Sequence, residues 1–96
     1  MRNRYLICYD ICDPKRLRRT FRKMQGYGDA MQFSVFICEL SLKEKAVLMA
    51  ELDEIINHSE DCVMAIDLGT IDRDLDDKVS FLGVKKDLPE RQALIL

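Results

Sequence analysis

The stretch YLICYDICDPKRLRR, residues 5–19, decides how this chain is expected to fold. Its first five residues form an unbroken apolar run, rich in aromatic and branched side chains and too short for a free-standing helix, which predicts a central β-strand. Such a run has no polar side, so both faces of the strand need cover. Asp13 followed by Pro14 then indicates a helix start, because the carboxylate can accept a free amide and proline suits the first helical position.

Asp10 is the candidate catalytic residue of this stretch. It follows the apolar run directly, at the C-terminal edge of the predicted strand, whereas Asp13 already has a structural task as a helix cap. A turn carboxylate bonded to nearby amides is the alternative interpretation of Asp10. If this protein carries out chemistry, we expect it at Asp10.

The predicted helix, residues 14–25, is basic on one side. Its apolar face carries Leu17, Thr20, Phe21 and Met24, and the other face carries six cations without an acid: Lys15, Arg16, Arg18, Arg19, Arg22 and Lys23. The net charge of −2 hides this asymmetry, because residues 1–23 hold eight Lys and Arg against two Asp. A basic patch indicates an anionic partner, with nucleic acid first, and a solvated charged face is the alternative.

The remaining elements predict the fold class. Gly26 and Gly28 are expected to end the first helix in the left-handed conformation. Residues 30–40 form one extended strand, or two strands kinked near residues 32–34. Ser41 and Glu44 form a capping box that opens a second, mostly buried helix to about Asn57, and residues 62–68 form another apolar strand. This order predicts one α+β domain over residues 1–96, ferredoxin-like βαββαβ, with its core at about residues 4–68.

Two helices can cover only one face of such a sheet, so we expect a second copy to cover the other face in a two-fold homodimer. A two-fold axis near the end of the first strand would bring two Asp10 carboxylates together. Like charges at that distance need a shared proton or a cation, and Mg²⁺ or Mn²⁺ suits carboxylate and phosphate oxygens. The chemistry available would be metal-assisted phosphodiester hydrolysis.

The composition points to a cytoplasmic protein. Its four cysteines, Cys8, Cys12, Cys38 and Cys62, contain no CxxC pair and mostly lie in apolar runs, which favours a reducing compartment without a zinc site. No signal peptide is visible, and no apolar run is long enough to span a bilayer. We therefore expect no membrane association.

The motifs YDICDPKRLRR, GYG and QFSVF, with the acidic pair Glu60 and Asp61 before the last core strand, closely resemble the second CRISPR-associated protein family. The resemblance covers about residues 5–68, and the FLG and LPER motifs of the tail also look like this family. It implies a homodimer in which the C-terminal segment, about residues 79–96, adds a strand to the partner's sheet. It further implies a metal between two Asp10 side chains, association with the CRISPR integrase that inserts new spacers, and binding of DNA or single-stranded RNA.

The resemblance also carries over particular residues. Family positions that match are Tyr9 and Asp10 at the strand end, the helix arginines Arg16, Arg18 and Arg19, and Ser34 and Phe36 in QFSVF. Tyr9 and Phe36 are expected to serve as interface core, and Ser34 to support the strand kink. Many relatives have an arginine where this chain has Ala30 and an acid where it has Ile37, and loss of that arginine removes a phosphate contact.

Three functions remain open at the level of sequence. The first is a metal-dependent endonuclease that uses Asp10 from both chains. The second is a non-catalytic scaffold dimer that bridges integrase subunits and holds DNA on its basic surfaces. The third is a ribonuclease toxin of the virulence-associated type, which resembles a relative of the same fold.

Overall fold

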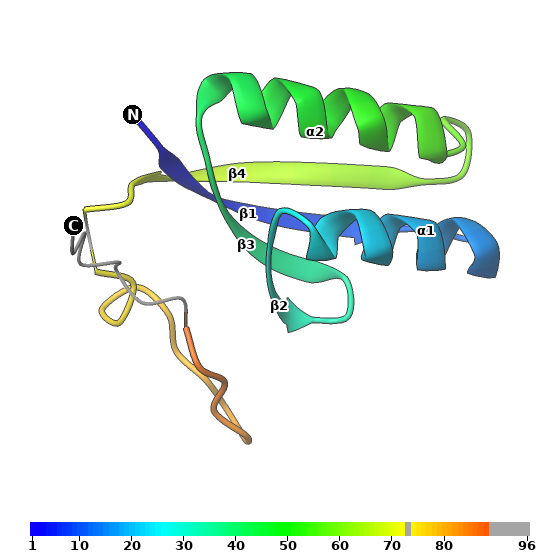
Figure 1. The fold of residues 1–96 in the computed structure, drawn as a ribbon. Helices are drawn as coiled ribbons and strands as arrows, with labels where there is room; N and C mark the ends of the chain where they lie inside the picture. Colours follow the sequence, from blue (N-terminus) through cyan, green and yellow to red (C-terminus); the bar gives the residue numbers. More distant parts are fainter. Residues whose placement is uncertain (73, 89–96) are drawn as a thin grey trace.

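Six elements form the fold in this computed structural model, which describes residues 1–72 and 74–88. In chain order they are β1 (Asn3–Asp10), α1 (Pro14–Gln25), β2 (Gly28–Gln32), β3 (Val35–Leu40), α2 (Leu42–Ile55) and β4 (Cys62–Thr70). The strands form one antiparallel sheet in the order β2-β3-β1-β4, with β1 between β3 and β4 (Figure 1). The predicted α+β fold, ferredoxin-like βαββαβ, is confirmed.

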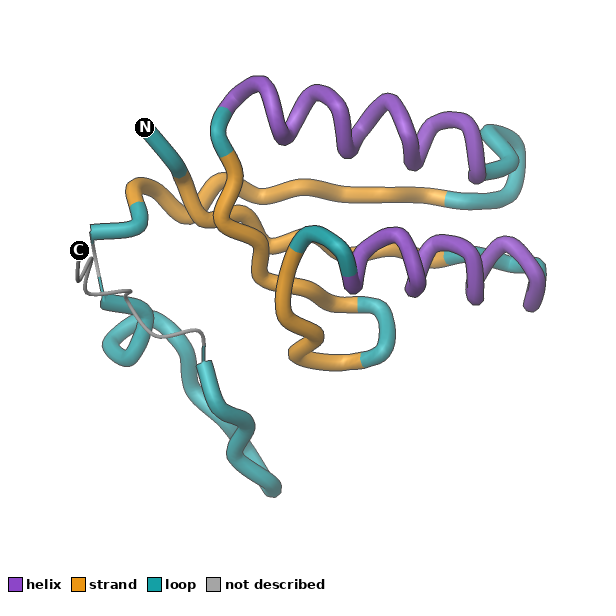
Figure 2. Tube along the Cα trace, in the orientation of Figure 1, coloured by secondary structure: helices purple, strands orange, loops and turns teal. Residues whose placement is uncertain are grey.

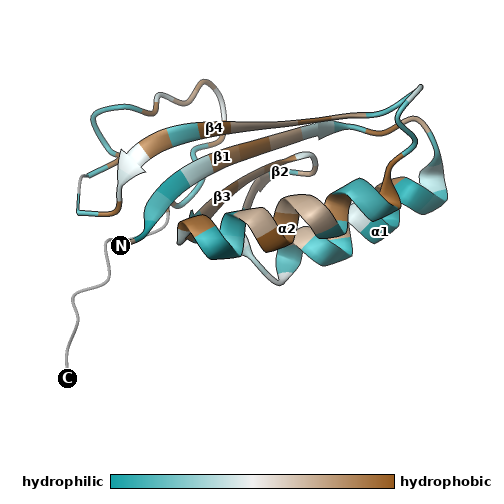
Figure 3. Ribbon diagram, turned by 90° about the horizontal axis from the view of Figure 1, so that it is seen from above, coloured by the Kyte–Doolittle hydropathy of each residue, from teal (hydrophilic) through white to brown (hydrophobic). Residues whose placement is uncertain are grey.

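Both helices lie on one face of the sheet (Figure 3). Side chains alternate along β1, so that Tyr5, Ile7 and Tyr9 point to the helices and are at most 6% exposed. They pack in one core cluster with Met24 from α1 and Leu48 from α2. The core therefore lies between the sheet and the helix layer, where it fixes the C-terminal end of β1.

Residues 30–40, for which the sequence left two alternatives, form parts of two strands. β2 and β3 pair antiparallel around a tight turn at residues 33–34, and their register shifts between Ala30 and Gln32. The turn is tied to the middle of the sheet, because the Tyr9 amide donates to the Ser34 carbonyl at 3.1 Å. The kink expected near residues 32–34 is thus a complete chain reversal.

The helix starts are confirmed, but the role given to the glycines is wrong. Gly26 caps α1 with a φ of −77°, in the right-handed region, so it does not use glycine's left-handed freedom. Gly28 is the first residue of β2, and a Cβ there would lie 2.4 Å from the Ile37 carbonyl oxygen and 2.5 Å from the Cys38 sulfur. Glycine is needed at position 28 because two strands approach closely there.

The expectation that α2 is mostly buried is also wrong. Leu48, Leu52 and Ile55 are buried, whereas Leu42 is 79% exposed and Val47 is 44% exposed. Only one side of α2 faces the sheet, so apolar residues around the rest of its circumference lie at the surface.

The second face of the sheet is covered only in part. On β4, Met64 is 52% exposed and Ile66 is 40% exposed. Residues 74–88 are loop (Figure 2), and Leu75, Val79 and Phe81 from this segment share a hollow of about 590 Å³ with side chains of β1 and β3. The additional C-terminal strand is not seen in residues 79–88, and residues 89–96 lie outside the described part of the chain.

No helix within residues 1–72 and 74–88 combines the length and apolar character that crossing a membrane requires.

Candidate metal and nucleic-acid site at the end of β1

Asp10 is the last residue of β1 and is exposed. By the alternation of the strand it shares its side of the sheet with Leu6 and Cys8, opposite the helices. Its cross-strand neighbour is Cys62, the first residue of β4. One chain thus presents one carboxylate at the edge of the open sheet face.

The next acid along the chain acts as predicted. The Asp13 carboxylate accepts hydrogen bonds from the amides of Lys15 and Arg16, both at 3.0 Å, and Pro14 occupies the first turn of α1. Asp13 is therefore occupied as a helix cap, whereas the Asp10 carboxylate has no hydrogen bond or ion pair among the described residues.

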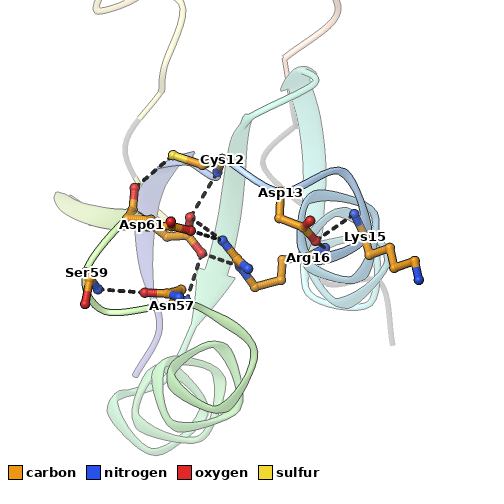
Figure 4. Close-up of polar contacts among 8 residues, drawn as sticks. Cys12, Asp13, Lys15, Arg16, Asn57, Ser59 and Asp61 are labelled. Atoms are coloured by element: carbon orange, nitrogen blue, oxygen red, sulfur yellow. Dashed lines mark hydrogen bonds and ion pairs between the residues drawn. The ribbon is translucent and has the colours of Figure 1, made fainter.

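Arg16 has an internal partner that the sequence did not reveal. Its guanidinium donates to the Asp61 carboxylate at 2.7 and 3.3 Å and to Glu60 at 3.0 Å (Figure 4). The same carboxylate accepts the amides of Cys12 and Asn57, at 2.9 and 2.8 Å. Glu60 and Asp61 were recognised as a family motif, but nothing in the sequence pairs them with a residue more than 40 positions away.

These contacts shift the ionisation of both partners. The hydrogen bonds from Arg16, and then those from the backbone of Asn57 and Cys12, hold the pKa of Asp61 well below its usual range. Asp61 in turn raises the pKa of Arg16. Arg16 thus joins the start of α1 to the start of β4, and its charge is largely satisfied within the chain.

Three of the other cations of α1 lie on the side that faces α2. On the α2 side, Lys23 lies 3.7 Å from Glu51, and a shallow hollow of about 410 Å³ is lined by Arg19, Arg22, Lys23, Glu51, Glu54 and Ile55. Lys15, Arg18, Arg19 and Arg22 are exposed, and within the described residues none of these four has an ion pair. The part of the basic helix that is open to an anion is therefore smaller than the six cations suggest.

Tyr9 and Phe36 belong to the chain's own core, which corrects the expectation that they form interface core. Phe36 is fully buried, and its ring stacks on that of Tyr9 with centroids 6.3 Å apart. The Tyr9 hydroxyl donates to the Phe33 carbonyl at 2.7 Å, and burial raises the pKa of Tyr9 to about 12. Together with Ser34, whose carbonyl accepts the Tyr9 amide, these residues hold the β2–β3 turn beside Asp10.

The donor set of one chain fits a cation only in part. Among the described residues, no group of three or more His, Cys, Asp or Glu side chains is placed to hold a metal. Mg²⁺ keeps several waters and commonly takes only one or two protein carboxylates, so an exposed Asp10 fits half of such a site. A second copy would have to supply the other half.

Comparison with known proteins identifies the family. The family model described as CRISPR associated protein Cas2 matches residues 2–74. A protein from Geobacter sulfurreducens named CRISPR-associated endoribonuclease Cas2 is 40% identical over all of both chains. CRISPR-associated endoribonuclease Cas2 1 from Rhodospirillum rubrum is 40% identical over 96% of this chain and 89% of its own length.

Solved structures agree with this assignment. The crystal structure of Streptococcus pyogenes Cas2 superposes with a TM-score of 0.75 at 29% identity, over 83% of this chain and 99% of that one. A hypothetical protein from Thermus thermophilus superposes with a TM-score of 0.79 at 26% identity, over 94% of this chain and all of its own. The predicted family resemblance is confirmed, and this chain belongs to the CRISPR-associated Cas2 family.

Proposed function

We propose that this protein acts as a homodimer in CRISPR adaptation, the acquisition of new spacers, and that its two Asp10 carboxylates form a metal-dependent site for phosphodiester hydrolysis. The observation that carries the proposal is the position of Asp10, exposed at the end of a sheet face that the helices leave open. The names of the curated relatives, endoribonucleases of the same family, support the same activity.

The open face supports a dimer. Leu6, Cys8, Met64 and Ile66 make it apolar, and Met64 and Ile66 keep about half of their surface exposed in one chain. If two copies of the chain pair through this face, both apolar surfaces become buried. The two-fold axis of such a dimer would then relate the two Asp10 side chains.

The residues around Asp10 suit a nucleic-acid backbone. Lys15 and Arg18, exposed near the start of α1, would hold phosphate groups of DNA or single-stranded RNA. The two Asp10 carboxylates would hold Mg²⁺ or Mn²⁺, which when bound polarises a phosphate and activates water. The free thiols of the four cysteines suit a reducing cytoplasm.

A second candidate function is a non-catalytic scaffold dimer that bridges subunits of the CRISPR integrase, the protein partner that family membership implies. One observation favours it: the basic surface of α1 is complete in a single chain, whereas the candidate metal site is not. The family assignment favours either of these functions over a virulence-associated toxin.

Spacer integration in vitro with the cognate integrase tests the proposal. The reactions compare no added chain, wild type, Asp10→Asn and a matched control, Asp53→Asn, which changes an exposed acid on α2. Light scattering checks that each variant dimerises. A parallel assay follows cleavage of single-stranded RNA and duplex DNA with Mg²⁺, with Mn²⁺ and with a chelator.

The expected result is that all three proteins dimerise and that only Asp10→Asn loses metal-dependent cleavage, by 100-fold or more. The scaffold function is supported instead if integration requires the chain, Asp10→Asn works as well as wild type, and wild type cleaves neither nucleic acid. A monomeric wild type, or integration that is indifferent to the chain, would overturn the proposed role in adaptation.

A further inference from the structure

Phe33 is an exposed aromatic residue held in a defined position. It lies in the β2–β3 turn and keeps 49% of its surface exposed. Its ring meets Phe21 of α1 edge to face, with centroids 4.7 Å apart and planes at 76°. Its backbone is anchored to β1, because its carbonyl accepts the Tyr9 hydroxyl at 2.7 Å. Packing and anchoring both limit its motion, so its open side is a preorganised flat surface.

The charge beside this ring is positive. On a helix, Arg18 lies one turn before Phe21, so it borders the flank of α1 that Phe21 presents to the turn. Arg18 is exposed, and within the described residues it has no ion pair. Three of the acids near α1, namely Glu60, Asp61 and Glu51, pair with Arg16 and Lys23 instead.

We propose that Phe33 is a stacking platform for one base of a single-stranded nucleic acid whose adjoining phosphate is held by Arg18. Exposed aromatic rings interleaved with cations are the common means of binding single strands, because every base offers a flat face and every linkage a phosphate. A duplex hides its base faces, so this platform selects single strands or unpaired ends. The inference rests on the proposed nucleic-acid function and specifies its substrate class.

The position of the platform separates it from the proposed dimer contact. Phe33 packs against α1, on the helix side of the sheet, whereas Asp10 and the apolar face lie on the other side. Both are at the end of the sheet where β1 stops and the β2–β3 turn contacts it. A strand stacked on Phe33 could therefore pass around this edge toward Asp10 while a second copy covers the apolar face.

Binding of a 12-nucleotide single strand and of a duplex of the same sequence, followed by fluorescence anisotropy, tests this inference. A 2-aminopurine base in the single strand reports stacking through quenching. The variants are Phe33→Ala, Phe33→Tyr, which keeps a ring, Arg18→Ala, and a matched control, Leu42→Ala, which truncates an exposed apolar residue on α2. Circular dichroism melting checks that each variant folds.

We expect Phe33→Ala to weaken single-strand binding by about 5- to 100-fold and to abolish quenching, while duplex binding changes less than about 2-fold. Phe33→Tyr and Leu42→Ala should bind as wild type does. Arg18→Ala should weaken the binding of both ligands and make that binding less dependent on salt. Wild-type affinity and quenching in a folded Phe33→Ala would overturn the platform alone. A wild type that binds neither ligand would overturn both the nucleic-acid function and the platform. If Phe33→Ala loses dimerisation and keeps its affinity for the single strand, Phe33 is a protein contact and the platform is overturned.

Discussion

Arg16 and Asp61 join the start of α1 to the start of β4 through two hydrogen bonds, at 2.7 and 3.3 Å, although they lie 45 residues apart. The Asp61 side chain is fully buried, and it also accepts two backbone amides. A single carboxylate thus connects the first βα loop, α1 and the segment before β4, directly beside the strand end that carries Asp10.

Removing the charge of Asp61 should destabilise the fold. Asp61→Asn keeps the shape of the side chain but leaves the Arg16 guanidinium without its main partner, so we expect the thermal unfolding midpoint to fall by about 5–10 °C. Glu60→Gln is the matched control, because Glu60 pairs with the same arginine but is 55% exposed. It should lower the unfolding midpoint by less than about 2 °C, because an exposed ion pair contributes little to stability. Equal effects of the two substitutions would contradict the central position of Asp61.

The same carboxylate makes stability depend on pH. The pKa of Asp61 in the folded protein lies well below its value in the unfolded chain, which is about 4. Its contribution is therefore fully present above about pH 4 and is lost progressively as the pH falls toward the folded pKa. Urea unfolding between pH 7 and pH 2 should show this loss, and Asp61→Asn should flatten the curve below about pH 4. A parallel fall in both proteins would assign the acid sensitivity to other groups.

Position 28 should tolerate no side chain, whereas position 26 should accept alanine. The Cβ of Gly28→Ala would overlap the Ile37 carbonyl and the Cys38 sulfur, and backbone cannot move aside cheaply, so we expect a loss of about 1–3 kcal/mol in the free energy of unfolding. Gly26→Ala meets its nearest atom at an ordinary 3.4 Å with a φ of −77°, so it should be neutral or stabilising by about 0.4–1 kcal/mol. Chemical denaturation of the two variants decides, and equal losses would refute the close approach at Gly28.

Thr20 should be more stable as valine. It is fully buried in α1, and its hydroxyl has no hydrogen-bond partner among the described residues. Thr20→Val replaces that hydroxyl with a methyl group of similar size, so we expect a gain of about 1 kcal/mol in the free energy of unfolding. Thr20→Ser, which keeps the hydroxyl and loses the methyl group, should destabilise the protein in the same assay. A Thr20→Val variant less stable than wild type would indicate that the hydroxyl is satisfied in solution.

The cysteines should differ strongly in reactivity. Cys38 is buried, and burial raises the pKa of its thiol to about 12, whereas Cys12 is exposed. Timed alkylation at pH 8 with mass spectrometry should therefore label Cys12 within minutes and Cys38 only after denaturant is added. Cys62 is exposed in one chain, and slow labelling there beside fast labelling of Cys12 would fit a dimer through the open face. Rapid labelling of native Cys38 would contradict the packing of β3.

Local sequence was sufficient for the fold because its signals act over a few residues. The apolar run of β1, the Asp13 cap with Pro14, and the Ser41–Glu44 capping box each predict an element from neighbouring side chains, and all three are present. The order of these elements then favoured ferredoxin-like topology, and the motifs around Asp10 placed the chain in its family.

The tertiary structure decided which of these residues are still available. Six cations on α1 look equivalent in sequence, but Asp61 and Glu51 arrive from distant segments and engage Arg16 and Lys23. Likewise, Phe33 and Phe36 are three positions apart in one motif, yet one is half exposed beside Phe21 and the other is fully buried. Such differences depend on contacts between residues 12 or more positions apart, which no local pattern encodes, whereas helix caps and strand runs depend on neighbours in the chain.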